Sequence, residues 1–393
     1  MVGNLIENVK KGDRLIWFVL ISLSVISLLA VYSSTRSLAY RQQGGNTEFY
    51  LFKHLFVLAL GLGITYFVQK INHAYFSRIA LYMMLLSIPL LIYTLAFGNE
   101  MNDAKRWITL PIINMSFQSS DFAKLALIMY TSRTLAIKQG VIKDFWDGFI
   151  PVLLPIGIIC GLIMMENMST ALILFMTNLV IMFLGRVNMK YVISMIGVGV
   201  MTLGIVVAIS YFSTSGGRYL TWKNRMIDYF DTNPENPSYQ TMHANIAIAN
   251  GGLIRLAPGK STQSNFLPEA YSDFIYATII EEYGLVGGAF VIFLYLLLLY
   301  RIIVIVQNSN RIFSALMALG LGMSLVIQAF INMGVAVNLL PVTGLTLPFV
   351  SMGGSSIWFN GFAMGIILSV SSYIESNQPA IKKSKTSQVE LNV

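Results

Sequence analysis

The feature that most constrains this chain is a series of long apolar segments that contain almost no charge. The first covers residues 15–35, and similar segments recur as far as residue 373, most of them separated by short polar connections. A helix of about 20 apolar residues crosses the hydrocarbon core of a bilayer. Only 11% of the 393 residues are charged, against about 25% in a soluble domain. The sequence therefore predicts an all-α polytopic membrane protein and excludes a soluble enzyme.

We expect ten membrane-spanning helices. Nine segments are uncharged or hold a single arginine, Arg301, whereas residues 121–137 contain both Lys124 and Arg133. The nine are residues 15–35, 54–69, 79–99, 148–165, 167–185, 191–212, 283–306, 312–337 and 347–373.

The distribution of lysine and arginine decides whether residues 121–137 cross, because short cytoplasmic loops carry an excess of these residues. With ten spans and a cytoplasmic N-terminus, the inner loops and termini hold fifteen, against only a few in the short outer loops, among them Arg36, Arg41, Lys105 and Arg106. Without residues 121–137, most of the basic residues would lie outside. We therefore expect both termini in the cytoplasm and the protein in the cytoplasmic (inner) membrane.

The domain organisation follows from these spans. Residues 1–375 are expected to form one membrane domain, with residues 213–275 as a large outer loop between the seventh and eighth helices. This loop is long enough to escape the charge rule. Within it, residues 239–250 show helical apolar spacing and are expected to form an amphipathic helix along the membrane surface. Residues 376–393 are polar and are expected to be a disordered cytoplasmic tail.

Ionisable residues at membrane depth are costly and are treated as site candidates. A structural ion pair that locks a helix end is the alternative for each one. Asp121 and Lys124 are one helical turn apart and are expected to face each other. The candidates converge on the outer side, which indicates a polar cavity open to the outside; they are Lys105, Arg106, Asp121, Lys124, Glu166, Glu269, Asp273, Glu281 and Glu282.

Asp273 lies where Pro268 and Glu269 turn the chain into the eighth span. A half-buried carboxylate in this position can have a raised pKa and act as a general base. The alternative is that Asp273 caps the N-terminus of the following helix.

Two further segments indicate a site. Lys105 and Arg106 precede Trp107, and two cations at the interface could bind a phosphate or only contact lipid headgroups. Residues 341–356 contain two prolines and three glycines. They predict either a broken entry into the last span that lines a cavity or close helix packing through small residues. From these features alone, a transporter and a membrane-embedded transferase both fit, and the transporter is favoured.

Several distinct motifs follow one another along almost the whole chain. They are Lys105-Arg106-Trp107-Ile108, Gln118 to Lys124, Tyr239-Gln240, Leu267-Pro268-Glu269-Ala270 followed by Asp273-Phe274-Ile275, Glu281-Glu282 with Gly284, Asn332-Met333-Gly334, Leu340-Pro341, Gly344 to Phe349, and Gly353-Gly354-Ser355-Ser356. With these motifs the chain resembles the SEDS family (shape, elongation, division and sporulation), which includes the FtsW, RodA and SpoVE proteins.

The resemblance implies a peptidoglycan glycosyltransferase that polymerises lipid II at the outer face of the cytoplasmic membrane. Asp273 matches the family's proposed catalytic aspartate, which would take the proton from the acceptor 4-hydroxyl as undecaprenyl pyrophosphate leaves. The other expected substrate-binding residues are Lys105, Arg106, Gln118, Asp121, Lys124, Glu269 and Ser355. The family is also thought to need a divalent cation, Mg²⁺ or Mn²⁺.

The branch within the family is indicated by two motifs, at residues 267–270 and 346–349, which look more like the FtsW division branch. A division member would act with a class B penicillin-binding protein, which supplies the transpeptidase, and with other division proteins, and no nucleic acid is expected as a partner. A lipid II flippase or another transporter, and a RodA-like elongation polymerase, are the alternatives.

The chain also departs from the family pattern. The family's Pro-Asp-x-Gly-Thr-Ala is here residues 166–171, so Asn167 and Ser169 replace the aspartate and the glycine. Glu166 could restore a carboxylate one residue earlier, and no charged role is assigned to Asn167. Ala257 and Met352 also stand where the family usually has glycine and tyrosine.

Overall fold

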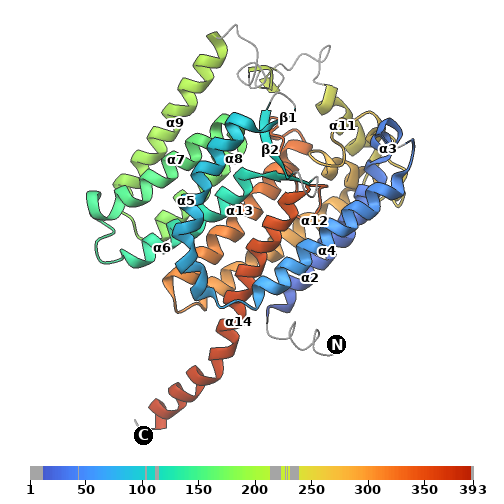
Figure 1. Ribbon diagram of the computed structural model, residues 1–393. Helices are drawn as coiled ribbons and strands as arrows, with labels where there is room; N and C mark the ends of the chain where they lie inside the picture. The colour runs from blue at the N-terminus through green and yellow to red at the C-terminus, as the bar shows by residue number, and fades with distance from the viewer. Residues whose placement is uncertain are drawn as a thin grey trace.

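The computed structural model describes residues 12–42, 44–101, 104–110, 115–212, 223–225, 227, 229–230 and 239–390. These residues form a helical bundle with a small antiparallel sheet at one end (Figure 1). In chain order the elements are α2 (Arg14–Ser34), α3 (Arg36–Gln42), α4 (Thr47–Gln69), α5 (His73–Phe97), β1 (Asn99–Met101), β2 (Ala104–Leu110), β3 (Met115–Gln118), α6 (Ser119–Ile137), η1 (Phe145–Phe149), α7 (Ile150–Glu166), α8 (Met168–Leu184), α9 (Met189–Phe212), α11 (Tyr239–Gly251), η2 (Gln263–Asn265), α12 (Ile275–Gln307), α13 (Ile312–Ala336) and α14 (Ser355–Glu390).

Each predicted span overlaps a helix of the bundle. Among the described residues, eight helices are long and apolar enough to cross a membrane. The apolar helix α8 is shorter, with 17 residues, and α6 is made less apolar by Lys124 and Arg133. The prediction of a multi-pass helical membrane protein is thus confirmed.

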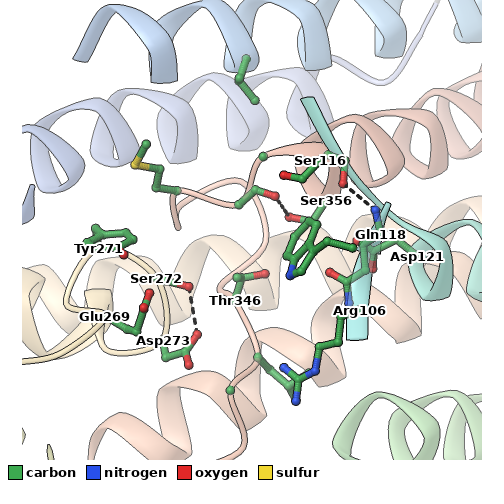
Figure 2. A pocket seen from close by; sticks show the side chains of 18 of the residues that line it. Arg106, Ser116, Gln118, Asp121, Glu269, Tyr271, Ser272, Asp273, Thr346 and Ser356 are labelled. Atoms are coloured by element: carbon green, nitrogen blue, oxygen red, sulfur yellow. Dashed lines mark hydrogen bonds between the residues drawn. The ribbon is translucent and has the colours of Figure 1, made fainter. Parts of the chain in front are cut away.

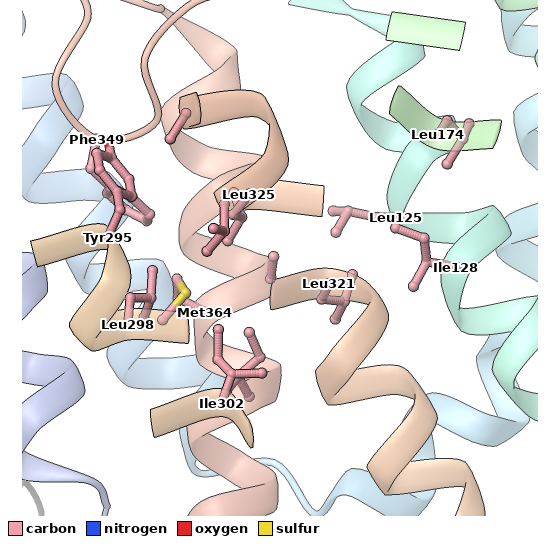
Figure 3. Packing of buried hydrophobic residues seen from close by; sticks show 14 of the residues in the cluster. Leu125, Ile128, Leu174, Tyr295, Leu298, Ile302, Leu321, Leu325, Phe349 and Met364 are labelled. Carbon is pink, nitrogen blue, oxygen red and sulfur yellow. The ribbon is translucent and has the colours of Figure 1, made fainter. Parts of the chain in front are cut away.

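Helix α13 lies at the centre of the bundle and packs against α6, α8, α12 and α14 (Figure 3). Its side chains Leu321 and Leu325 are buried in the apolar core. Gly320 approaches α6 and α8 so closely that a Cβ atom there would meet Ile128 and Ile181. Small residues allow this kind of close approach between membrane helices.

The sheet joins α5 to α6 and was not predicted, because these short strands are outside the apolar runs. Its order is β1-β2-β3, and Trp107 pairs with Gln118 across β2 and β3. This pairing brings the Lys105-Arg106-Trp107 motif next to the motif that starts at Gln118.

Helix α12 is broken at Gly284, whose φ of 72° and ψ of −176° are essentially restricted to glycine. The predicted start of this span at residue 283 falls at the break, and the helix itself begins earlier, at Ile275. The N–H groups of Leu285 and Val286 donate to the carbonyls of Gly252 and Leu253, at 3.0 and 3.2 Å. The outer segment after α11 thus satisfies the backbone groups that the break leaves open.

Helix α11 confirms the helix predicted at residues 239–250. It packs against α12 and buries Ala244, Ala247 and Gly251. Within the rest of the large outer loop, residues 213–222, 226, 228 and 231–238 lie outside the described residues.

The last helix differs from the prediction at both ends. Residues 339–354 are irregular and α14 begins at Ser355, so the broken entry is confirmed and the predicted start at residue 347 is too early. The tail that we expected to be disordered continues α14 to Glu390 and projects from the bundle (Figure 1). A helix without packing is only marginally stable in water, so sequence composition separates it poorly from a disordered chain.

Candidate functional site

A cavity of about 460 Å³ lies at the end of the bundle that carries the sheet (Figure 2). Its lining comes from α4, the sheet, α6, the start of α8, the turn at residues 269–273, α13 and residues 344–356. Seven of the predicted site residues line it together: Arg106, Gln118, Asp121, Lys124, Glu269, Asp273 and Ser355. The eighth, Lys105, lies on β2, and its side chain is outside the described residues.

Asp273 is held in a turn that directly precedes α12. The backbone N–H groups of Ser272 and Asp273 both donate to the carbonyl of Glu269, at 3.0 Å. The alternative role of Asp273 as a helix cap is wrong, because the N-cap of α12 is Phe274 and no side chain caps it. Instead, the Asp273 Oδ1 atom accepts a hydrogen bond from the Ser272 hydroxyl, at 2.9 Å.

The backbone of this turn is fastened to the irregular segment before α14. Asn332 Nδ2 donates to the carbonyls of Asp273 and Leu345, at 2.9 and 2.6 Å. The Ser351 hydroxyl donates to the carbonyl of Ser272, at 2.6 Å. Asp273 is therefore fixed relative to both α13 and the residues that precede α14.

Burial has the largest effect on the pKa values of Asp273 and Glu269, two acidic groups of the cavity. It raises the pKa of Asp273 above the usual range, an effect partly opposed by the Ser272 hydrogen bond and by the charges of Arg225 and Arg106. Burial also raises the pKa of Glu269, and the nearby Asp273 raises it further. Both carboxyl groups therefore keep a proton to a higher pH than an exposed carboxyl would.

Arg106 lies across the cavity from Asp273, with Thr346 between them in Figure 2. The Nε atom of Arg106 donates to the carbonyl of Glu166 at 3.1 Å. This bond holds the strand β2 against the end of α7.

The predicted pairing of Asp121 with Lys124 is confirmed, with 3.4 Å between Oδ1 and Nζ. Lys124 Nζ also donates to Gln328 Oε1 at 3.1 Å, and Gln328 Nε2 donates to the Thr346 carbonyl at 2.9 Å. This chain of contacts connects α6 through α13 to the segment before α14. The other oxygen of Asp121, Oδ2, is buried and has no hydrogen-bond partner among the described residues.

The remaining two predicted residues bring β3 and α14 together. The backbone N–H of Gln118 donates to the Ser355 hydroxyl at 3.2 Å. The Gln118 side chain donates to the Ser120 hydroxyl at 3.0 Å.

Two predicted members of the outer cluster belong elsewhere. Glu281 and Glu282 do not line the cavity, because their carboxylates accept hydrogen bonds from residues 261–263 and from Ser33. They fasten the outer segment to α12 and α2. Sequence spacing alone did not separate these two acids from those of the cavity.

The structure also shows where the residues that depart from the family pattern at positions 166–171 lie. Asn167 lines the cavity, and its side chain caps α8 by accepting from the N–H groups of Ser169 and Thr170, at 3.1 and 3.3 Å. Glu166 is buried at the end of α7.

Sequence reasoning missed the contribution of α4. Lys53 and His54 line the cavity, although the predicted span began at residue 54 and gave neither residue a role. Two adjacent ionisable residues beside a long apolar run were the available signal. His54 Nε2 lies 2.6 Å from the Ser27 hydroxyl, which donates to the Val350 carbonyl at 2.7 Å.

The expected divalent cation does not find a ready set of ligands. The part of the chain that the structure describes contains no group of three or more His, Cys, Asp or Glu side chains suited to hold a metal. Asp121, one of the cavity acids, is already paired with Lys124. These side chains do not build a cation site by themselves.

Comparisons with known proteins agree with the motifs. The family model described as cell cycle protein, which covers FtsW, RodA and SpoVE, matches residues 13–376. A relative from Polynucleobacter necessarius subsp. necessarius (strain STIR1) is 33% identical over 371 residues, which cover 91% of this chain and 85% of the relative. A relative from Coxiella burnetii (strain RSA 493 / Nine Mile phase I) is 33% identical over 363 residues, covering 90% and 95%. Both relatives are named probable peptidoglycan glycosyltransferase FtsW.

Solved structures share the fold. The rod shape determining protein RodA of Thermus thermophilus aligns with a TM-score of 0.67 and 23% identity, covering 91% of this chain and 96% of that one. A chain from a study of a peptidoglycan synthase complex that coordinates polymerization and crosslinking aligns with a TM-score of 0.72 and 23% identity, covering 91% and 97%.

The Asn332 contacts lead to a prediction about stability. Asn332→Ala would leave the buried carbonyls of Asp273 and Leu345 without this donor, and we expect it to lower the free energy of unfolding by about 1–3 kcal/mol. Chemical denaturation in detergent micelles measures the change. The control is Asn308→Ala, at an exposed residue that donates only to Val304 in its own helix, with an expected change of less than about 0.5 kcal/mol. Equal losses in the two variants would contradict the role of Asn332.

Proposed function

Because the chain belongs to the cell cycle protein family of FtsW, RodA and SpoVE, we propose that it is a peptidoglycan glycosyltransferase that polymerises lipid II. The observation that carries this proposal is the placement of Asp273. Its carboxylate is half-buried, has a raised pKa and shares one cavity with Arg106 and Lys124. A base with a raised pKa and cations for a leaving phosphate are the groups that this transfer needs.

In the proposed reaction, the Asp273 carboxylate accepts the proton of the acceptor sugar's 4-hydroxyl. The acceptor oxygen forms a bond to the anomeric carbon of the donor, and the bond from that carbon to the pyrophosphate oxygen breaks. Undecaprenyl pyrophosphate leaves with the electron pair. Arg106, Lys124 and Lys105 compensate the negative charge that develops on it, while Gln118, Asp121, Glu269 and Ser355 bind the substrate.

We further propose that all ten helices that match the predicted spans cross the membrane, with both termini in the cytoplasm. In this orientation the cavity opens at the outer face of the cytoplasmic membrane, and the lipid tail stays in the bilayer. The inferred excess of lysine and arginine in the inner loops supports this arrangement.

The structure offers an argument against the flippase or transporter alternative. Below Lys124 the next cavity has a volume of only about 10 Å³ and is lined mainly by apolar side chains such as Leu125, Ile128 and Leu325. This volume is at the lower limit for one water molecule. The described residues below Lys124 are therefore closely packed and mostly apolar, which favours a reaction at one face.

The relatives named FtsW support a septal role in cell division over the RodA-like alternative. A similar fold occurs in a peptidoglycan synthase complex that coordinates polymerization with crosslinking. We propose that this chain likewise acts with a class B penicillin-binding protein as its transpeptidase, together with other division proteins.

The role of Asp273 predicts the outcome of an isosteric change. Asp273→Asn keeps the size of the side chain but cannot take the proton, so we expect the rate of polymerisation to fall by about 10²–10⁴-fold. The measurement is the gel pattern of glycan strands formed from lipid II by the purified protein with its transpeptidase partner. Asp144→Asn, an exposed change near η1, should keep the wild-type rate. Unchanged polymer from Asp273→Asn would refute the catalytic assignment.

The raised pKa of Asp273 predicts a pH dependence. The base acts in its ionised form, so activity falls as the pH decreases through the pKa of this group. We expect the acidic midpoint of kcat/KM to lie above 3.8, the ordinary value for aspartic acid. Rates measured after brief acid exposure and return to neutral pH control for denaturation. A reversible midpoint at or below that value would contradict the prediction.

A further inference from the structure

Arg225 is a charged residue of the large outer loop, residues 213–275, and the proposed mechanism does not use it. It lies at residues 223–225, a short helical piece between α9 and α11, and its side chain is partly buried. Close to it in the chain, the Tyr229 hydroxyl donates to the Leu339 carbonyl at 3.0 Å. This bond connects the outer segment to the irregular residues that lead to Gly344.

Gly344 defines the space between Arg225 and Asp273. Its φ is +68°, a conformation that favours glycine. A Cβ atom on Gly344 would lie 3.5 Å from Asp273 Oδ2 and 3.8 and 3.9 Å from the two terminal nitrogens of Arg225. The carboxylate and the guanidinium therefore flank the same point, which the missing side chain leaves open.

Among the described residues, no direct hydrogen bond or ion pair joins the Arg225 guanidinium to the Asp273 carboxylate. This separation matters for a base, because a direct bidentate ion pair would occupy the oxygen lone pairs that must accept a proton. At this separation the cation still favours the ionised carboxylate through its electric field.

The electrostatic effects of the two groups are reciprocal. Burial raises the pKa of Asp273, and the charge of Arg225 lowers it. Burial lowers the pKa of Arg225, and the charge of Asp273 raises it. The other charged or titratable groups acting in the same place are Arg106, which also lowers the pKa of Asp273, and Glu269 and Tyr271, which are coupled to Asp273.

We propose that Arg225 is a positioning residue for the transfer reaction, which keeps Asp273 ionised from across the gap at Gly344. This inference rests on the proposed function, because it assigns Arg225 a part in making Asp273 an effective base. Arg225 acts through Asp273 and leaves Oδ2, the oxygen that does not accept the Ser272 hydrogen bond, available to the acceptor hydroxyl.

The test is the pH profile of lipid II polymerisation by the full-length protein with its transpeptidase partner. We expect Arg225→Gln to move the acidic midpoint of kcat/KM upward by about one pH unit, because an opposite charge within several ångströms shifts a pKa by this order. Below the midpoint the rate then falls by about 10-fold. Well above it, the rate returns to within about 3-fold of the wild type, because Asp273 is ionised without help.

Matched variants separate this effect from a loss of structure. Arg225→Lys keeps the charge and should hold the midpoint within about 0.3 units of the wild type. Arg225→Met removes the charge but keeps an apolar stem, and it should shift the profile as Arg225→Gln does. Arg255→Gln changes a half-buried arginine of the same large outer loop, whose guanidinium donates to the Asn250 carbonyl at 2.9 Å, and should leave the acidic midpoint unchanged.

The results distinguish the two levels of the argument. If the wild type forms no polymer at any pH, the proposed function itself is wrong. If the wild type forms polymer and both neutral variants keep its midpoint, only the role of Arg225 is refuted. A shift in Arg225→Lys as large as that in Arg225→Gln, or a uniform loss of rate at every pH, would likewise overturn it.

Discussion

The arrangement of the site depends on how the chain carries irregular backbone through an apolar bundle. Residues 339–354 form no helix, so their carbonyl groups need partners from elsewhere, since an unsatisfied backbone group in a membrane interior costs several kcal/mol. Side chains from surrounding helices supply these partners: Asn332 to Leu345, Gln328 to Thr346, Tyr295 to Pro348 and Ser27 to Val350. These polar side chains satisfy the carbonyl groups of residues 339–354 and also hold this segment in place relative to the surrounding helices.

The turn that carries Asp273 depends on the same segment. Asn332 and Ser351 donate to its backbone, and the N–H of Met352 donates to the Tyr271 carbonyl at 2.9 Å. On the far side, the Lys124 contact with Gln328 connects α6 to the same residues. Asp273 and Lys124 thus reach one cavity from distant parts of the sequence because both are fastened to residues 339–354. Arg106 is held separately, by its hydrogen bond to the Glu166 carbonyl. A polar network of this kind specifies geometry only when its members are satisfied.

Much of this architecture could be predicted from the sequence. The uncharged apolar runs predict the helices, and the few ionisable residues at the outer ends of the spans predict the cavity. Asp121 and Lys124 could be paired from helical spacing alone, and the prolines and glycines of residues 341–356 indicated the broken entry. The assignment of Asp273 came from the family motif, because the residues alone left a helix cap as an alternative.

Other features depend on tertiary contacts that have no local pattern. The strands beside Arg106 are too short for a periodic signal, and Glu281 and Glu282 differ from the cavity acids only in what packs against them. Arg225 and Asp273 come close to each other at Gly344, which is more than a hundred positions after Arg225 in the chain. Local spacing in the sequence cannot predict this contact. Lys53 and His54, in contrast, carry a signal in the sequence, because they are two adjacent ionisable residues beside a long apolar run.

The central claim is that the cavity around Asp273 opens to the outer face and receives lipid II there. The most direct test places a cysteine at Met352, which lines the cavity, after the chain's one native cysteine is removed by Cys160→Ser. We predict that a membrane-impermeant maleimide added outside right-side-out vesicles labels Met352→Cys, and that lipid II slows the labelling. Asn310→Cys, in the exposed connection between α12 and α13, should react only after permeabilisation. Labelling of Met352→Cys from the inner side alone, or at a rate unaffected by lipid II, would contradict the claim.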